Sequence, residues 1–219
     1  MTDTFPIHSL QHPGLLHAML ALASLQVSKL EQSPPTTAHK HYHIALRRVA
    51  KNVTMPSKRL RLATLAATLL LAYFEVWNSE HTKWCSHLYG ARTLFAEIPL
   101  RDMARRCLPA RSLKYRQGIA KSMGLAFADA PLLPDPNGLD FDLLTTITGH
   151  RVAADDYCLR EDQLFQNVKS PVTEKDIENF ENFQDLFWWY CKMDVYQAML
   201  GGAKLLYVHG VAGDSEGNG

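Results

Sequence analysis

The chain has 219 residues, of which 47% are hydrophobic and 10% aromatic, so a packed core is expected and whole-chain disorder is excluded. The longest apolar stretch, residues 62–74, is too short to span a bilayer, and no charged-then-apolar leader begins at Met1, so neither a membrane protein nor a secreted protein is expected. The net charge of +1 hides a division: residues 1–121 carry a net +11 and residues 122–219 a net −10. Such a division fits either a nucleic-acid surface or two halves that attract each other.

Helical periodicity dominates the first hundred residues. The pattern predicts four helices, at about residues 13–30, 37–53, 59–77 and 82–98. Their short links imply antiparallel neighbours, and no run alternates with a period of two, so no strand is predicted. The helix at 59–77 is apolar nearly all round and is expected at the centre of the core.

The second half is less regular. One or two short basic helices are predicted at residues 100–121, followed by a Pro-rich acidic loop at 126–140 and a short helix at 141–148. Residues 150–170 are mixed and polar. A long aromatic helix is predicted at about 173–207, with Thr173 as its N-cap and Gly201-Gly202 at its end or at a kink. Residues 208–219 carry no fold signal and are expected to form a flexible tail.

The fold prediction is all-α: an antiparallel helical bundle extended by the long C-terminal aromatic helix. We treat residues 1–219 as a single helical domain, in which 12–98 form a four-helix core, 99–172 a basic then acidic irregular segment, 173–207 a long docking helix and 208–219 the tail. The predicted core consists of Leu16, Leu20, Leu65, Leu69, Phe74, Trp77, Leu88, Phe95, Leu186 and Trp188.

Two surfaces are candidates for binding. Basic side chains between residues 101 and 121 form a candidate electrostatic interaction surface, made of Arg101, Arg105, Arg106, Arg111, Lys114 and Arg116. It lacks the aromatic interleaving of single-strand binders, so an acidic partner is preferred over DNA, for instance Asp155, Asp156, Glu161 or Asp162 of the same chain. The second candidate is an effector pocket lined by Phe183, Phe187, Trp188 and Tyr190, with simple core packing as the alternative.

The sequence gives little support for a metal site or a catalytic site. The four cysteines, Cys85, Cys107, Cys158 and Cys191, are widely spaced, which excludes a zinc ribbon or zinc finger and favours reduced thiols. His39 and His43 are four residues apart, but we expect exposed or interfacial histidines rather than a metal site. No metal and no cofactor is therefore predicted.

A catalytic group near the junction of the third and fourth helices is the remaining enzymatic possibility. Glu75, His81 and His87 lie there, without a nucleophile elbow or a phosphate loop. We expect a structural role, in which Glu75 meets a donor and Trp77 and Trp84 wedge the two helices. Cys85 and Cys191 follow aromatic residues and are expected to be buried small hydrophobes rather than redox sensors.

A series of motifs runs through most of the chain in order: GLLHAMLALASLQVSKL, HKHYHIALRRVAKNV, LATLAATLLLAYFEVWNSEHTKWCSHLYGAR, GLDFDLLTTITGHRV and NFQDLFWWYCKMDVYQAMLGG. Over about residues 12–206 they resemble the fungal-specific transcription factor domain, the middle homology region of fungal zinc-cluster transcription factors. The zinc cluster that binds DNA in such factors has no counterpart among the scattered cysteines of this chain. The family's helical region also usually continues beyond the last of these motifs, so the chain looks like a piece of a regulator or a shortened relative.

The resemblance implies a non-enzymatic regulatory module in the nucleus. Its mechanism would be helical packing that a ligand or partner shifts, and its partners would be other parts of a transcription factor or coregulator proteins, with a small hydrophobic effector as a further ligand. DNA contact by this chain and membrane contact are not expected. Two alternatives stay open: a stand-alone helical module that binds a small molecule or a protein, and an enzyme with an unrecognised site.

Overall fold

The structure, a computed structural model, describes residues 4–124, 151, 172–202 and 205–206. These residues form helices and no strand, which confirms the all-α prediction. The chain divides into two compact units, and each is described by itself. The core unit comprises Met1–Ile98 and Asn182–Gly219, and the basic unit comprises Pro99–Glu181, so the boundary between them lies within the last helix.

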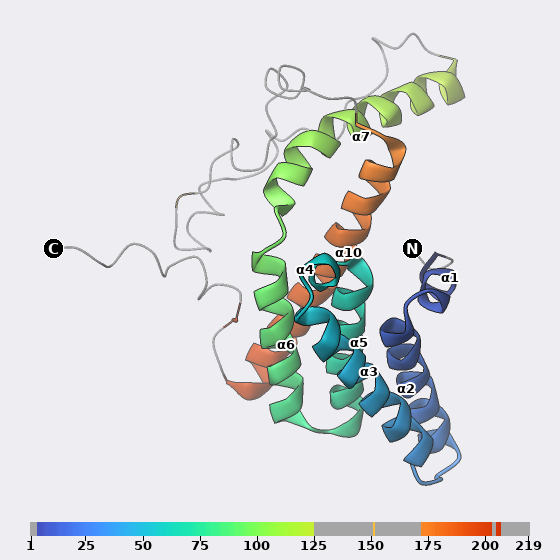
Figure 1. The fold of residues 1–219 in the computed structure, drawn as a ribbon. Coiled ribbons are helices and arrows are strands. Elements are labelled where there is room, and N and C mark those ends of the chain that lie inside the picture. The colour runs from blue at the N-terminus through green and yellow to red at the C-terminus, as the bar shows by residue number, and fades with distance from the viewer. Residues whose placement is uncertain (1–3, 125–150, 152–171, 203–204, 207–219) are drawn as a thin grey trace, which may run out of the picture. The chain divides into compact units, whose positions relative to one another are not determined.

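The core unit holds seven helices or parts of helices among the described residues: α1 (Thr4–Leu10), α2 (Pro13–Leu30), α3 (Thr36–Val53), α4 (Pro56–Arg59), α5 (Leu62–Asn78), α6 (His81–Ala96) and the part of α10 (Glu174–Gly201) from Asn182 onward. In Figure 1, α2 and α3 form one antiparallel hairpin and α5 and α6 another. Pro13 begins α2 as expected, since its missing N–H costs nothing in a first turn. The predicted third helix starts late, because Leu60 and Arg61 leave the helical conformation between α4 and α5.

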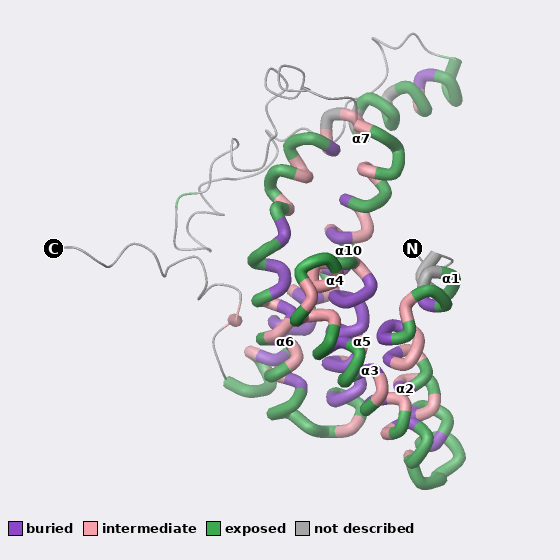
Figure 2. Tube along the Cα trace, in the orientation of Figure 1, coloured by how far each residue is buried: buried purple, intermediate pink, exposed green. Residues whose placement is uncertain are grey.

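Helix α5 is the centre of the core unit, as its all-round apolar sequence predicted. It packs against α2, α3 and α6, and its middle is buried over nearly its whole circumference (Figure 2). Most of the predicted core residues are buried, namely Leu65, Leu69, Phe74, Leu88, Phe95 and Leu186. Each such side chain contributes about 1.5–3 kcal/mol of hydrophobic stabilisation.

Four predicted core residues are wrong. Leu16 is only partly buried, while Leu20, Trp77 and Trp188 are exposed. For Trp188 the reason is helical geometry: two residues along a helix turn a side chain by about 200°, so Trp188 lies opposite the buried Leu186. Trp77 lies on the surface at the end of α5, with its ring against Tyr73, so it does not wedge the helices. Trp84 on α6 is buried.

The buried face of α2 carries mostly small residues, together with Leu15 and Leu25. α2 buries Gly14, Leu15, Ala18, Ala21, Leu25 and Ser28, and α3 buries Ala38, Tyr42, Ala45 and Val49. Small residues let the two backbones approach closely: a Cβ on Gly14 would lie 3.3 Å from the Cβ of Arg48. The predicted core residues Leu16 and Leu20 thus lie about one residue around the helix from the buried Leu15 and Ala21.

The basic unit contains α7 (Leu100–Met123), a single helix where one or two short ones were predicted. It also contains the start of α10. Thr173 caps that helix as predicted: its hydroxyl accepts a hydrogen bond from the N–H of Asp176 at 3.2 Å and donates one to that carboxylate at 2.7 Å. The cap lowers the pKa of Asp176, chiefly through the hydroxyl of Thr173.

The C-terminal end of α10 falls at Gly201, six residues before the predicted end at 207. Gly202 follows with a φ of +61°, a left-handed conformation that a glycine adopts without strain. The N–H of Leu206 then donates a hydrogen bond of 3.0 Å to the buried carboxylate of Asp194, so the chain folds back at the two glycines. The predicted elements at 126–140 and 141–148, nearly all of 150–170, and the tail at 208–219 lie outside the described residues.

Candidate functional site

The four aromatic residues of the predicted effector pocket do not share one environment. Phe183 and Tyr190 are buried, Phe187 is partly buried, and Trp188 is 59% exposed. The ring of Phe95 on α6 lies 5.5 Å from that of Phe187 and 5.4 Å from that of Tyr190. These three rings pack against one another, while Trp188 touches only the edge of this group, 6.1 Å from Phe187.

The outer face of α10 is apolar as well. We call the outer face the exposed residues Trp188, Val195, Tyr196, Met199 and Leu200. Trp188, Val195 and Met199 follow one another at intervals of seven and four residues, so they lie on one side of the helix, with the exposed Lys192 between them. Trp189 beside them is partly buried, with its ring 6.3 Å from that of Tyr73. α10 is therefore apolar on the side that packs and on the side that faces solvent.

The basic surface of α7 is partly neutralised inside the basic unit. Arg111 forms an ion pair of 3.2 Å with Glu181, and Lys114 forms one with Glu174. The hydrogen bond between Lys114 and Glu174 raises the pKa of the lysine and lowers that of the carboxyl group. These carboxylates lie in α10, whereas the acidic residues at 155–162 proposed from the sequence lie outside the described residues.

The other cations of the predicted surface lie along the first turns of α7. Arg101, Arg105 and Arg106 are exposed, and Arg105 lies 3.8 Å from Asp102. The side chain of Arg116 is outside the described part of the chain. Because Arg111 and Lys114 already pair with carboxylates of this chain, the geometry is that of an internal electrostatic contact with exposed arginines beside it.

Glu75 and Tyr42 are buried and form a polar group with His87, which is partly buried. The hydroxyl of Tyr42 on α3 and Nε2 of His87 on α6 are 2.9 Å apart. Burial, then a hydrogen bond to Glu75 and its charge, raises the pKa of Tyr42 well above its usual value. Burial lowers the pKa of His87, against the pull of Glu75 in the other direction. Tyr42 is therefore a donor beside Glu75.

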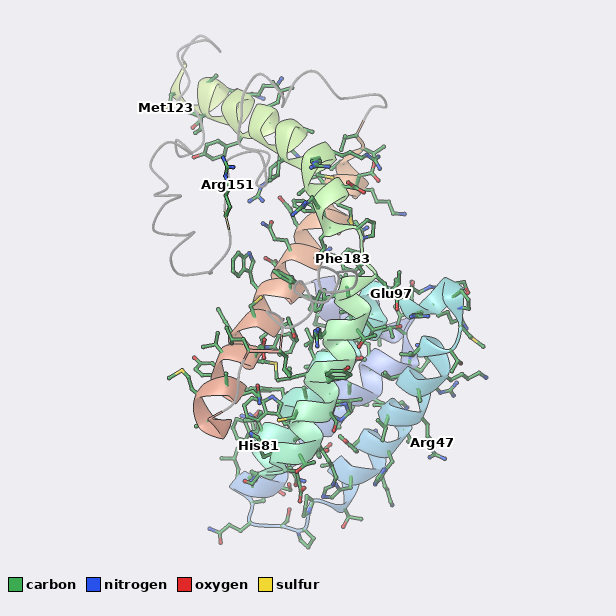
Figure 3. All side chains as sticks on the ribbon, turned by 90° about the vertical axis from the view of Figure 1, so that its left-hand side faces the viewer. Arg47, His81, Glu97, Met123, Arg151 and Phe183 are labelled. Carbon is green, nitrogen blue, oxygen red and sulfur yellow. The ribbon has the colours of Figure 1, made fainter. Side chains whose placement is uncertain are left out.

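His81 belongs to a different group. It is exposed at the start of α6, where Figure 3 labels it, and its ring lies 5.5 Å from that of Trp84. Its ring nitrogens Nδ1 and Nε2 lie 3.7 and 3.8 Å from Sγ of Cys85, which is partly exposed. The imagined catalytic set of Glu75, His81 and His87 therefore separates into two places.

A pair of histidines between α2 and α3 was missed from the sequence. Nδ1 of His17 and Nδ1 of His41 are 2.9 Å apart, and the rings stack with centroids separated by 5.1 Å. Burial lowers the pKa of His17, and the nearby His41 and Arg48 lower it further. The pairing is invisible in the sequence, because it depends on how two helices are rotated against each other.

The histidines that the sequence did single out are not joined. The ring of His39 is partly buried edge-on against Phe74, at 5.7 Å, and His43 is exposed beside Tyr42. Among the residues that the structure describes, no group of three or more His, Cys, Asp or Glu side chains is placed to hold a metal ion. In the same part of the chain, no helix is both long and apolar enough to cross a membrane.

Comparison with protein families gives a match over residues 3–122, to the model described as "Fungal specific transcription factor domain". The match covers more than half of the chain and includes α1 to α6 and nearly all of α7. Neither a curated protein nor a solved structure matches the chain.

Proteins of this family act in transcription regulation, and the matched region holds the buried helical core described above. The family is generally non-enzymatic and its members generally act in the nucleus. The resemblance found in the sequence is confirmed, because the chain belongs to the fungal-specific transcription factor domain family.

Proposed function

We propose that this chain is the regulatory module of a fungal zinc-cluster-type transcription factor, and that it acts in the nucleus and without enzymatic activity. It scaffolds the protein through its helical core and transmits a signal when a partner docks on the outer face of α10. The partner is another part of the transcription factor or a coregulator protein. The whole chain then works as one regulatory domain, with the basic residues of α7 serving contacts within the protein rather than contacts to DNA.

One observation carries the docking proposal: the outer face of α10 exposes large apolar side chains. A surface helix normally shows polar residues to solvent, and contiguous exposed apolar patches are typical of interaction sites. Trp188, Tyr196 and Met199 are each more than half exposed. Aromatic residues and methionine are also the residue types enriched in protein interfaces.

We also propose a small hydrophobic effector as a second ligand of the chain. Phe183, Phe187, Trp188 and Tyr190 are its candidate residues, but the rings of Phe95, Phe187 and Tyr190 already fill the space between them. An effector would therefore enter from the side of Trp188 and displace a ring. Native mass spectrometry of the purified chain tests this: a stoichiometric bound compound supports a pocket, and a bare chain supports simple packing.

The regulatory proposal is tested by fusing the whole chain to a foreign DNA-binding domain in fungal cells that carry a reporter gene. We expect reporter expression to differ from that given by the DNA-binding domain alone, at equal protein levels. Identical expression from the two proteins would argue for a stand-alone binding module instead.

A further inference from the structure

The three cysteines that the structure describes differ sharply in their surroundings. Cys107 is buried, and its thiol lies 3.7 Å from the backbone oxygen of Asp176. Burial raises the pKa of Cys107, and burial together with the charge of Asp194 raises the pKa of Cys191 to about 11. Both thiols are thereby held in the unreactive protonated form, since the thiolate is the nucleophile.

Cys85 differs from both in its neighbour. Cys85 and Cys191 are both partly exposed, so the prediction that they are buried is wrong, but only at Cys85 among the described cysteines do both ring nitrogens of a histidine, His81, lie within 3.8 Å of the sulfur. The two residues are four apart on α6, so the helix holds them on one side, one turn from each other. An exposed imidazole in contact with a thiol can accept its proton, which is how cysteine nucleophiles are activated.

The end of α10 packs closely against His81, beside buried polar atoms that lack partners among the described residues. A Cβ on Gly201 would lie 3.3 Å from the ring of His81 and 3.6 Å from Nε2 of Gln197, so the glycine lets the backbone approach that ring. Oε1 of Gln197 is buried and has no hydrogen-bond partner among the described residues. The same holds within that part of the chain for Nε1 of Trp84, whose ring meets that of His81 edge-on. An indole N–H is a donor, so it lacks an acceptor such as a carbonyl oxygen.

We propose that Cys85 and His81 form a covalent binding site for α,β-unsaturated carbonyl compounds. A ring nitrogen of His81 takes the thiol proton, and the sulfur of Cys85 attacks the β-carbon of the compound. A carbon–sulfur bond forms, the electron pair of the carbon–carbon double bond moves toward the carbonyl group, and the imidazolium returns the proton to the α-carbon. The reaction is an addition, with no leaving group and no oxidant. This inference goes beyond the proposed function and does not depend on it.

N-ethylmaleimide, which is such a compound, tests the site in the native full-length chain. Labelling over time is mapped to each cysteine by mass spectrometry of peptides, which also separates Cys158. We expect Cys85 to react at least about tenfold faster than Cys107 and Cys191. A labelling rate of Cys85 equal to that of Cys191 would overturn the proposal.

A histidine substitution tests the role of His81. We expect His81→Asn to slow the labelling of Cys85 by about tenfold or more, the range of a positioned general base. The matched control is His43→Asn, which removes another exposed histidine of the same unit and should leave the rate unchanged. Equal rates in the two variants would show that His81 does not activate the thiol. If His81→Asn unfolds the chain, so that all thiols react quickly, the order of labelling in the unaltered chain still decides.

The substitution Trp84→Phe tests whether the site at Cys85 prefers carbonyl compounds. This change keeps an aromatic ring and removes only the indole N–H. We expect slower labelling of Cys85 by N-ethylmaleimide but an unchanged rate with methyl methanethiosulfonate, which has no carbonyl group. An equal effect on both reagents would contradict the assignment of carbonyl compounds as the ligand class.

Discussion

His17 and His41 share a single hydrogen bond between α2 and α3, and the bond requires that one Nδ1 be unprotonated. The pKa of His17 is lowered in the folded chain, first by burial and then by His41 and Arg48. The unfolded chain therefore binds a proton at a higher pH than the folded chain does, and the stability of the fold rises with pH across that interval. The lowered pKa of His87 acts in the same direction.

We therefore expect the denaturant midpoint of unfolding to fall when the pH is lowered from about 7.5 to about 5.5, the range in which histidine titrates. His17→Gln should reduce the size of that fall, because it removes a histidine whose pKa is lowered in the folded chain. Circular dichroism during urea titration at both pH values provides the measurement. A midpoint that rises on acidification would contradict this account of the histidine pair.

A substitution of Tyr42 tests the polar group that this residue forms with His87 and Glu75. Tyr42→Phe removes the hydroxyl that bonds His87 and faces Glu75, and it leaves the ring stack on Phe74 in place. Leaving a partly buried histidine and a buried carboxylate without this partner should lower the free energy of unfolding by about 1–3 kcal/mol. Tyr89→Phe on the exposed side of α6 is the control and should change stability little. A neutral effect of Tyr42→Phe would mean that the polar group adds nothing to stability.

Two leucine substitutions test which face of α2 is buried. Leu25 is 2% exposed and Leu30 is 78% exposed. We expect Leu25→Ala to cost about 2–5 kcal/mol and Leu30→Ala less than about 0.5 kcal/mol, because only the first leaves a cavity. Thermal or urea unfolding measures both. Equal losses would mean that the buried face of α2 is not the one that carries Ala18 and Ala21.

The link between α5 and α6 contains a strained residue. Ser79 ends α5 with a φ of +62°, and the N–H of Glu80 returns to the carbonyl oxygen of Glu75 at 3.0 Å. A non-glycine residue in this left-handed conformation costs about 1 kcal/mol, so Ser79→Gly should raise stability by a fraction of that amount after the entropy of glycine is included. Ser86→Gly within α6 should instead destabilise by about 0.5–1 kcal/mol. A loss of stability in Ser79→Gly would contradict the strained turn.

Helical periodicity and helix-breaking residues in the sequence predicted where most helices of the core unit lie. Pro13, the Ser33-Pro34-Pro35 break and the apolar run of α5 placed the helices of the core unit within a few residues. They could not fix which face of α2 is buried, because that helix is apolar on most of its circumference and the choice depends on the close approach of α3. The pair of His81 and Cys85 was readable from its spacing of four residues, whereas the pairs His17–His41 and Tyr42–His87 depend on packing between helices.

For the molecule as a whole, the family and the fold agree on a helical regulator of transcription. The division of charge between the two halves of the sequence takes a more specific form in the structure. Two of the basic residues of α7 pair with carboxylates at the start of α10, inside one unit. The charge division thus serves contacts within the chain, at least for Arg111 and Lys114.

If the outer face of α10 carries the regulatory contact, as we propose, two surface substitutions in the reporter fusion should differ in their effects. Trp188 and Tyr89 are 59% and 58% exposed, so replacing either with alanine should leave the core intact. We expect Trp188→Ala to abolish most of the difference in reporter expression between the fusion and the DNA-binding domain alone, and Tyr89→Ala to preserve it. Full retention of that difference in Trp188→Ala, or an equal loss in both variants at equal protein levels, would contradict the account.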